Sequence, residues 1–171
     1  HLFLLGAHVV FVHFAEPGLD GHPVGDLDAV AFEAHDLAGS VGHEAQAADA
    51  VIFWGGINHT LDSESNDKPH MDLIGDQNKL IPLLAKANPN TVVVITAGSP
   101  VEMPWIDEVN AVVWGWYAGM EGGNALADII VGNVNPSGRL ADTWADSYED
   151  YPCYDSFSER NPEKNQEDYR E

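Results

Sequence analysis

Three short apolar runs constrain the fold of this chain more than any other feature. They are residues 51–56 (VIFWGG), 91–96 (TVVVIT) and 111–116 (AVVWGW), and each is rich in β-branched or aromatic side chains. Uninterrupted apolar runs of this length are typical of parallel strands that are covered on both faces. Glycine, proline or asparagine follows closely after each run, as expected where a strand ends in a turn. The runs therefore predict three strands of a buried sheet.

Helical patterns fill the chain between and after these runs. Residues 77–87 repeat leucine and alanine at helical spacing, and a glycine-flanked segment at 121–130 predicts a second helix. Pro82 lies within the first of these helices and is costly there unless it falls in the first turn, where its missing N–H is not needed. Strands that alternate with helices predict an α/β fold. We expect a doubly wound, mostly parallel sheet with helices on both faces, an α/β sandwich.

The other segments are less regular. Residues 7–14 are rich in β-branched and aromatic side chains and predict a strand, which a turn at 16–23 closes. Residues 26–48 carry an apolar stripe at helical spacing that glycines interrupt, so we interpret them as a short strand followed by a helix. Residues 140–144 are a candidate for one more short strand. Beyond Asp146 the sequence is polar and irregular.

Composition excludes several classes of partner. The 171 residues suffice for one domain with a sizeable core, and 28 acidic against 7 basic side chains give a formal net charge of −21. Such a surface repels phosphate backbones and anionic lipids, so neither nucleic acid nor a membrane is an expected partner. No apolar run approaches the ~20 residues that span a bilayer. The single cysteine, Cys153, cannot form an internal disulfide, and no signal peptide is visible, so localisation stays open.

A polar loop of residues 58–72 (NHTLDSESNDKPHMD) follows the first apolar run. Open α/β sheets place their functional groups at the carboxyl ends of strands, which is where this loop begins. Its charged groups are four carboxylates and one lysine: Asp62, Glu64, Asp67, Asp72 and Lys68. Solvated loops are often acidic, so this alone does not establish a site. The histidines and carboxylates of the loop show no H-x-x-x-H or H-E-x-x-H spacing, and we therefore predict no metal.

Five segments, in order and at matching spacing, carry a resemblance to a known family. They are residues 62–77 (DSESNDKPHMDLIGDQ), 87–94 (ANPNTVVV), 99–105 (SPVEMPW), 116–128 (WYAGMEGGNALAD) and 132–140 (GNVNPSGRL). With these segments, the run from Ala50 to Trp144 resembles the α/β-sandwich domain of glycoside hydrolase family 3, the β-glucosidase family. The resemblance implies a carbohydrate substrate and no cofactor.

The resemblance also implies a mechanism. Enzymes of this family are similar in retaining configuration by a two-step displacement between two carboxyl groups. The nucleophilic aspartate lies in a (β/α)8 barrel that precedes this domain on a longer chain, and the general acid/base comes from a loop that matches residues 62–67. By position in this motif the acid/base is Glu64, whose pKa its neighbouring aspartates would raise. Asp67 and Lys68 match substrate-contacting positions, although Lys68 stands where the family usually has an arginine and Asn66 where it has an aromatic residue.

The same resemblance divides the chain. Residues 1–25 resemble the end of a β-rich, lectin-like insertion, residues 26–146 form the α/β sandwich, and residues 147–171 form a polar tail that leads to a missing C-terminal part. The function expected is therefore part of a retaining glycoside hydrolase that acts on terminal β-linked sugars of small oligosaccharides, with the barrel as partner and with this chain alone inactive. The alternative is a noncatalytic or degenerate α/β module that binds a small molecule or a protein.

Overall fold

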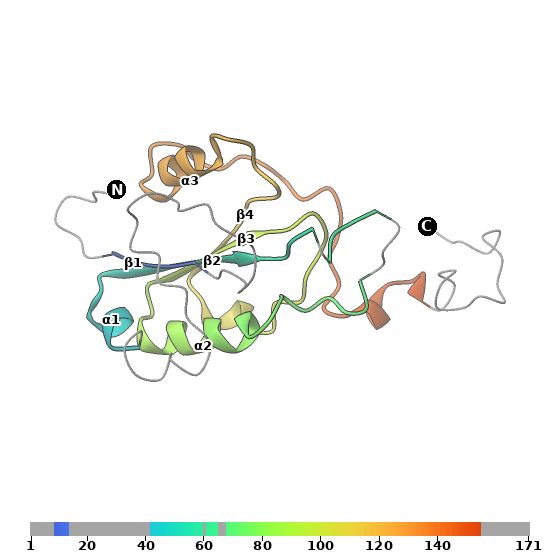
Figure 1. Cartoon of the computed structure of the whole chain (residues 1–171), viewed down its shortest axis with the longest axis horizontal. Coiled ribbons are helices and arrows are strands. Elements are labelled where there is room, and N and C mark those ends of the chain that lie inside the picture. The colour runs from blue at the N-terminus through green and yellow to red at the C-terminus, as the bar shows by residue number, and fades with distance from the viewer. Residues whose placement is uncertain (1–8, 14–41, 60, 65–67, 155–171) are drawn as a thin grey trace.

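The computed structural model describes residues 9–13, 42–59, 61–64 and 68–154, and it confirms the α/β class (Figure 1). Four parallel strands form one sheet in the order β1-β2-β3-β4: Val9–His13, Ala50–Gly56, Thr91–Thr96 and Ala111–Trp114. At the centre of the sheet Phe53 lies opposite Val93, which in turn lies opposite Val112. Because all four strands are parallel, the loops that follow them leave from one edge of the sheet, the carboxyl edge.

Helices cover both faces of this sheet. The helices α1 (Gly42–Ala47) and α2 (Gln77–Ala87) lie on one face, and α3 (Gly122–Ile130) lies on the other (Figure 1). Two short 3-10 helices, Ile106–Glu108 and Tyr148–Asp150, complete the described elements. The doubly wound arrangement predicted from the alternation of strands and helices is therefore confirmed.

The alternation of side chains along the strands explains why both faces need a cover. Phe53 and Val93 pack with Leu80, Ile81 and Leu84 of α2 in the larger core cluster. Their neighbours along the same strands face the opposite way, because successive strand side chains alternate between faces. This second set packs against α3 in the smaller cluster, which contains Ile52, Val94, Leu126, Trp54, Val113 and Ile130. The runs that form β2 and β3 are therefore covered on both faces, as is typical of central parallel strands.

Two expectations need correction, and Pro82 takes the costlier of its two possible places. β4 is not a fully buried strand: it is an edge strand whose residues are exposed or half-buried. Residues 140–144 form no strand, and Trp144 instead lies edge-on against Trp114, with ring centroids 4.2 Å apart. Pro82 is inside α2 rather than in its first turn, so the helix lacks one backbone hydrogen bond there.

The outer segments agree with expectation in part. The strand predicted within residues 7–14 is confirmed as β1, which pairs in parallel with β2 at the edge of the sheet. The helix predicted within 26–48 is present as α1, whereas the strand proposed before it and the turn at 16–23 lie outside the described residues. The divisions of the chain at residues 25 and 146 stay predictions.

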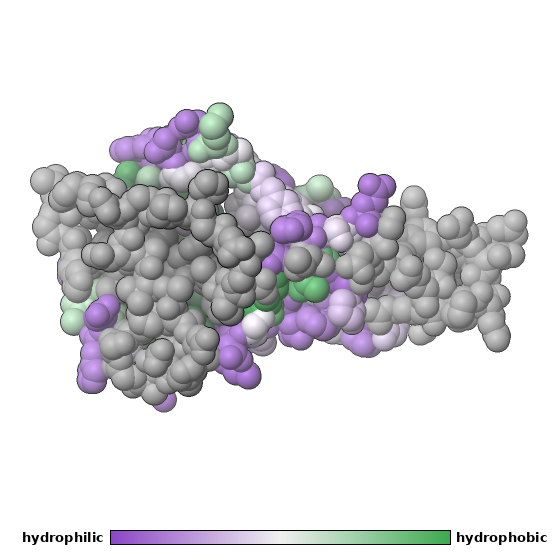
Figure 2. All heavy atoms as spheres, viewed as in Figure 1, coloured by the Kyte–Doolittle hydropathy of each residue, from purple (hydrophilic) through white to green (hydrophobic). Residues whose placement is uncertain are grey.

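The described surface carries hydrophilic side chains together with exposed hydrophobic ones such as Leu83, Met120 and Val134. In the view of Figure 2, hydrophilic side chains lie over α3 and also on the opposite side of the molecule, as the acidic composition leads one to expect. Over the residues that the structure describes, no helix has the length and apolar character needed to cross a membrane.

Candidate functional site at the carboxyl edge

The loops that follow β2, β3 and β4 meet at the side chain of Asp62. One carboxylate oxygen, Oδ2, accepts hydrogen bonds from the backbone N–H of Gly98 and from the Tyr117 hydroxyl, each at 2.8 Å. The other oxygen, Oδ1, lies 3.2 Å from the Ser99 hydroxyl. Asp62 belongs to the loop after β2, Gly98 and Ser99 to the loop after β3, and Tyr117 to the loop after β4. A single carboxylate therefore connects the three loops.

Glu64 lies two residues further along the same loop, and its side chain is exposed. The loop that carries it follows β2 and so leaves from the edge of the sheet at which α/β proteins hold their functional groups. A carboxyl group in this place can exchange a proton with a molecule that sits over the carboxyl edge. Asp67 lies outside the described residues, so its substrate contact and its effect on Glu64 stay predictions.

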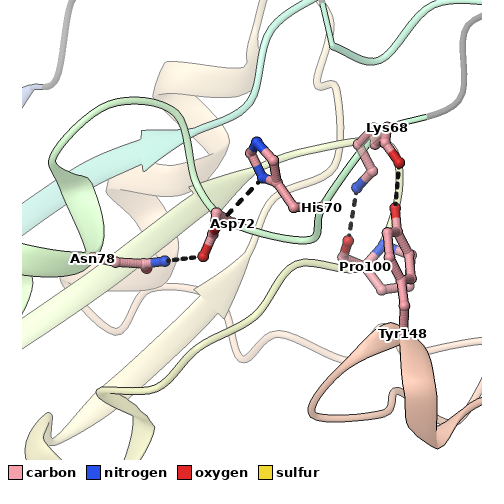
Figure 3. Close-up of polar contacts among 6 residues, drawn as sticks. All are labelled: Lys68, His70, Asp72, Asn78, Pro100 and Tyr148. Carbon is pink, nitrogen blue, oxygen red and sulfur yellow. Dashed lines mark hydrogen bonds and ion pairs between the residues drawn. The ribbon is translucent and has the colours of Figure 1, made fainter.

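Lys68 joins this loop to two other segments (Figure 3). Its ammonium donates a hydrogen bond to the carbonyl oxygen of Pro100 at 2.9 Å, and its own carbonyl oxygen accepts one from the Tyr148 hydroxyl at 3.3 Å. Burial lowers the pKa of Lys68, and the Asp62 carboxylate opposes that shift. Lys68 also lines an open pocket of about 510 Å³ with Ser99, Pro100, Tyr148 and others. It therefore has a structural contact beside the substrate contact predicted for it.

A second polar group occupies the end of the loop at residues 70–72. His70 Nδ1 lies 3.4 Å from Asp72 Oδ2, and Asn78 Nδ2 lies 3.4 Å from Asp72 Oδ1 (Figure 3). Asn78 in turn accepts a hydrogen bond at 2.8 Å from the indole N–H of Trp105, which is fully buried. The carboxylates that are neighbours in the sequence therefore divide: Asp62 contacts the loops after β3 and β4, and Asp72 contacts His70 and the first turn of α2.

Near this end of the loop, neighbouring charges change the pKa of a further carboxyl group, that of Glu102. The pKa of Glu102 is raised, first by desolvation and then by the charges of Asp72 and Glu149, while His70 lowers it. Within the described part of the chain, no three His, Cys, Asp or Glu side chains come together in a way that could hold a metal ion.

The sequence did not predict the part that Tyr117 plays. Its position falls within one of the five segments of the resemblance, but an uncharged side chain after an edge strand gave no sign of a contact with Asp62. The contact between Tyr117 and Asp62 follows a turn of the backbone. Trp116 adopts φ 51° at this turn, a left-handed conformation that is rare for a bulky residue. The Trp116 ring lies edge-on to Trp114, with centroids 5.6 Å apart. Trp114 is half-buried and packs against the larger core cluster, in which Trp105 is fully buried.

Comparison with known proteins decides the family. The profile described as "Glycosyl hydrolase family 3 C-terminal domain" matches residues 22–171. The chain belongs to glycosyl hydrolase family 3. A beta-glucosidase from Kluyveromyces marxianus is 42% identical over 109 residues, which are 64% of this chain and 13% of that protein. A beta-glucosidase from Bacteroides ovatus is 40% identical over 147 residues, which are 84% of this chain and 20% of that protein.

Solved structures of family 3 enzymes agree. The crystal structure of the Kluyveromyces marxianus beta-glucosidase in complex with glucose superposes with a TM-score of 0.68 at 37% identity, over 72% of this chain and 15% of that one. A family 3 exo-beta-xylosidase in complex with a xylobiose aziridine probe superposes with a TM-score of 0.66 at 30% identity, over 86% of this chain and 23% of that one. The family 3 chain described here thus spans less than a quarter of the length of these relatives and corresponds to one domain of larger glycosidases.

Proposed function

We propose that this domain supplies Glu64 as the general acid/base of a retaining, β-glucosidase-type glycoside hydrolase. The active site is shared with a (β/α)8 barrel of the same longer polypeptide, which provides the nucleophile. The substrates are terminal β-linked sugars of small oligosaccharides. Family membership supports this proposal, as do relatives named beta-glucosidase and a similar structure that is described in complex with glucose.

The observation that carries the proposal is that Glu64 is exposed, whereas the neighbouring carboxylates of Asp62 and Asp72 already contact other residues of the domain. Asp62 accepts hydrogen bonds from two other loops, and Asp72 is in contact with His70 and Asn78. Glu64 lies between them in the sequence, with its side chain exposed at the carboxyl edge. Among the loop carboxylates that the structure describes, Glu64 is therefore the one best placed to meet a substrate.

The reaction would need Glu64 in both of its protonation states. As a carboxylic acid it would protonate the leaving oxygen while the nucleophile attacks the anomeric carbon from the other side, about 5–5.5 Å away in retaining enzymes. As a carboxylate it would then take a proton from the water that releases the sugar. Asp67 and Lys68 would contact the substrate. A neutral sugar suits a domain of net charge −21, because its binding carries no electrostatic penalty.

The test compares Glu64→Ala with the parent in the longer polypeptide that carries the barrel. General acid catalysis contributes roughly 10²–10⁴-fold, so cleavage of unactivated disaccharides should fall by about that factor. An aryl glycoside with a dinitrophenolate leaving group needs no protonation and should still form the glycosyl-enzyme. Azide should then accelerate its turnover by attacking that intermediate.

The matched control is Glu108→Ala, which removes an exposed glutamate from the 3-10 helix before β4, at the opposite edge of the sheet. It should keep the parent's activity on both substrates. Parental activity of Glu64→Ala on disaccharides would show that the assignment of Glu64 is wrong.

A further inference from the structure

We infer that Asp62 is a positioning residue: with Tyr117 as its main partner, it fixes the loop that carries Glu64 against the loops after β3 and β4. The inference rests on the proposed function, because it assigns to Asp62 and Tyr117 an effect that acts through Glu64. Neither residue need touch the substrate.

The contacts of Asp62 immobilise its side chain and its backbone together. Oδ2 accepts from Gly98 N and Tyr117 Oη, both at 2.8 Å, and Oδ1 lies 3.2 Å from Ser99 Oγ. The backbone N–H of Asp62 donates to Asn58 O at 2.9 Å, which closes a turn at the start of the same loop. Hydrogen bonds to an ionised carboxylate are shorter and stronger than those between neutral groups. The backbone two residues before Glu64 is therefore held from three sides.

Gly98 shows how closely the loops approach one another. A Cβ atom on Gly98 would lie 2.4 Å from Asp62 Oδ2 and 2.9 Å from a ring carbon of Tyr117. Both distances are far inside van der Waals contact, so a larger residue fits only if the side chains of Asp62 and Tyr117 move away. The absence of a side chain at residue 98 lets the carboxylate reach the backbone amide while the phenol covers the other side of the same oxygen.

The position of Tyr117 is maintained at a cost to the backbone. Trp116 adopts φ 51°, and bulky residues hold such a conformation only where the surrounding structure enforces it. Such strain is concentrated at functional sites. Here the turn at Trp116 leads directly to the residue that donates to Asp62. Burial, together with the hydrogen bond to Asp62 and its charge, raises the pKa of Tyr117 to about 12, so the phenol remains a donor at any working pH.

The expected consequence concerns the orientation of the acid/base rather than substrate affinity. A displacement of about 1 Å in a reacting group can cost on the order of 100-fold in rate. If Asp62 and Tyr117 no longer hold the loop, Glu64 samples positions from which it cannot reach the leaving oxygen. The loss should then appear in kcat for substrates that need protonation, with KM little changed.

The test uses Asp62→Asn and Tyr117→Phe in the polypeptide that carries the barrel. Asp62→Asn keeps the shape but removes the charge, and Tyr117→Phe removes one hydroxyl. We expect kcat on a disaccharide to fall about 100-fold for Asp62→Asn and about 10-fold for Tyr117→Phe, with a much smaller fall in kcat/KM on a dinitrophenyl glycoside, which reports formation of the glycosyl-enzyme without protonation. The double variant should lose less than the product of the single losses, because both substitutions break one contact.

Thr91→Val is the control for general destabilisation. The Thr91 hydroxyl is buried and donates to Asn88 O at 2.7 Å, at the start of β3 and so at the amino edge of the sheet. This variant should lower the melting temperature while it leaves the ratio of the two rates at the parent value. If Asp62→Asn and Tyr117→Phe lower both rates by one factor, as a merely unstable variant would, the positioning role is overturned.

Hydrogen exchange on the 171-residue chain gives a readout that does not need activity. Amides in peptides that cover residues 57–64 and 97–99 should exchange faster in Asp62→Asn and in Tyr117→Phe, but not in Thr91→Val. Unchanged exchange would also overturn the inference. Glu64→Ala, assayed in parallel, tells the two proposals apart. If it keeps parental disaccharide activity, the proposed function fails and the inference fails with it. If it shows the expected loss while the Asp62 and Tyr117 variants do not, the inference alone fails.

Discussion

The side chain of Gln77 forms two hydrogen bonds with the backbone of a single residue, Gly56. Gln77 Oε1 accepts from Gly56 N and Gln77 Nε2 donates to Gly56 O, both at 2.8 Å. Nε2 also donates to Ile74 O at 2.9 Å, and the side chain is 1% exposed. Gln77 begins α2 and Gly56 ends β2. The polar loop between them is therefore closed at its base by one buried amide, and its ends cannot separate while that amide is in place.

We predict that Gln77→Leu destabilises the domain by about 2 kcal/mol or more, because Gly56 N–H, Gly56 O and Ile74 O, all in a partly buried place, would lose this partner. At roughly 2–4 °C per kcal/mol for a domain of this size, the melting temperature should fall by at least about 4 °C. Gln46→Leu, at an exposed position in α1, is the control and should change stability little. Equal melting temperatures for the two variants would show that the buried amide is not needed.

Gly56 itself leads to a second prediction, which rests on how closely its Cα approaches the backbone of Thr96 rather than on its hydrogen bonds. Its φ is 144°, and a Cβ atom there would lie 1.8 Å from the carbonyl oxygen of Thr96. Gly56→Ala should therefore cost more than about 2 kcal/mol, as strained and overpacked substitutions do. Gly123→Ala in α3 is the matched control. Nothing lies within 4 Å of its added Cβ, so this variant should be neutral or more stable by up to about 1 kcal/mol. Urea unfolding of both variants measures the contrast.

The elements that the sequence predicted best are those that follow from a local pattern of side chains. The leucine and alanine repeat predicted α2 over residues 77–87, and the apolar run at 91–96 predicted β3, both with the observed bounds. Each pattern reports burial of a face, and each face is indeed buried: Leu80 and Leu84 of α2 pack on the same cluster as Val93 and Ile95 of β3. The loop that carries Glu64 follows β2, as predicted from the position of its polar residues.

What the sequence did not predict depends on pairings across long distances in the chain. Asp62 contacts Gly98, 36 residues away, and Tyr117, 55 residues away, and no local pattern specifies such partners. From the sequence Asp62 was one of several like charges around Glu64, whereas in the structure its oxygens accept hydrogen bonds from other loops. The strand expected at residues 140–144 failed for a similar reason, because the Trp144 ring packs against Trp114 instead of extending the sheet.

The raised pKa of Glu102 leads to a prediction about pH. Desolvation, Asp72 and Glu149 all disfavour its charged form in the folded state, against the weaker opposing effect of His70. A carboxyl group whose pKa is higher folded than unfolded weakens the fold when ionised. The cost is therefore complete above the folded pKa and disappears as pH falls below the unfolded one. Glu102→Gln should then be more stable than the parent near pH 7, with the difference shrinking toward pH 4.

Glu108→Gln is the control for this titration, since it also removes one negative charge but from an exposed residue of the 3-10 helix before β4. It measures how far the removal of any one negative charge stabilises a domain of net charge −21 by reducing the repulsion among its carboxylates. Urea unfolding of both variants and the parent at several pH values gives the comparison. A gain in Glu102→Gln that does not exceed the gain in Glu108→Gln at pH 7 would contradict the local origin of the effect.

The last prediction is that the 171-residue chain alone hydrolyses no glycoside. The proposed mechanism needs a nucleophile on the face of the sugar opposite Glu64, and it takes that nucleophile from the barrel. Asp62 is a poor substitute, because its carboxylate already accepts hydrogen bonds from Gly98 and Tyr117 and lies on the same short loop as Glu64. Asp72 is likewise in contact with His70 and Asn78.

The chain should nevertheless fold, since β2 and β3 together with α2 enclose a cluster of fully buried side chains. Cooperative thermal unfolding would show that an inactive sample is folded. The assay uses an aryl β-glucoside and an aryl β-xyloside at high concentrations of the purified chain, with Glu64→Ala alongside. We expect both proteins to match the blank. Turnover that survives repurification and disappears in Glu64→Ala would mean that the chain contains its own nucleophile, and the shared-site proposal would then be wrong.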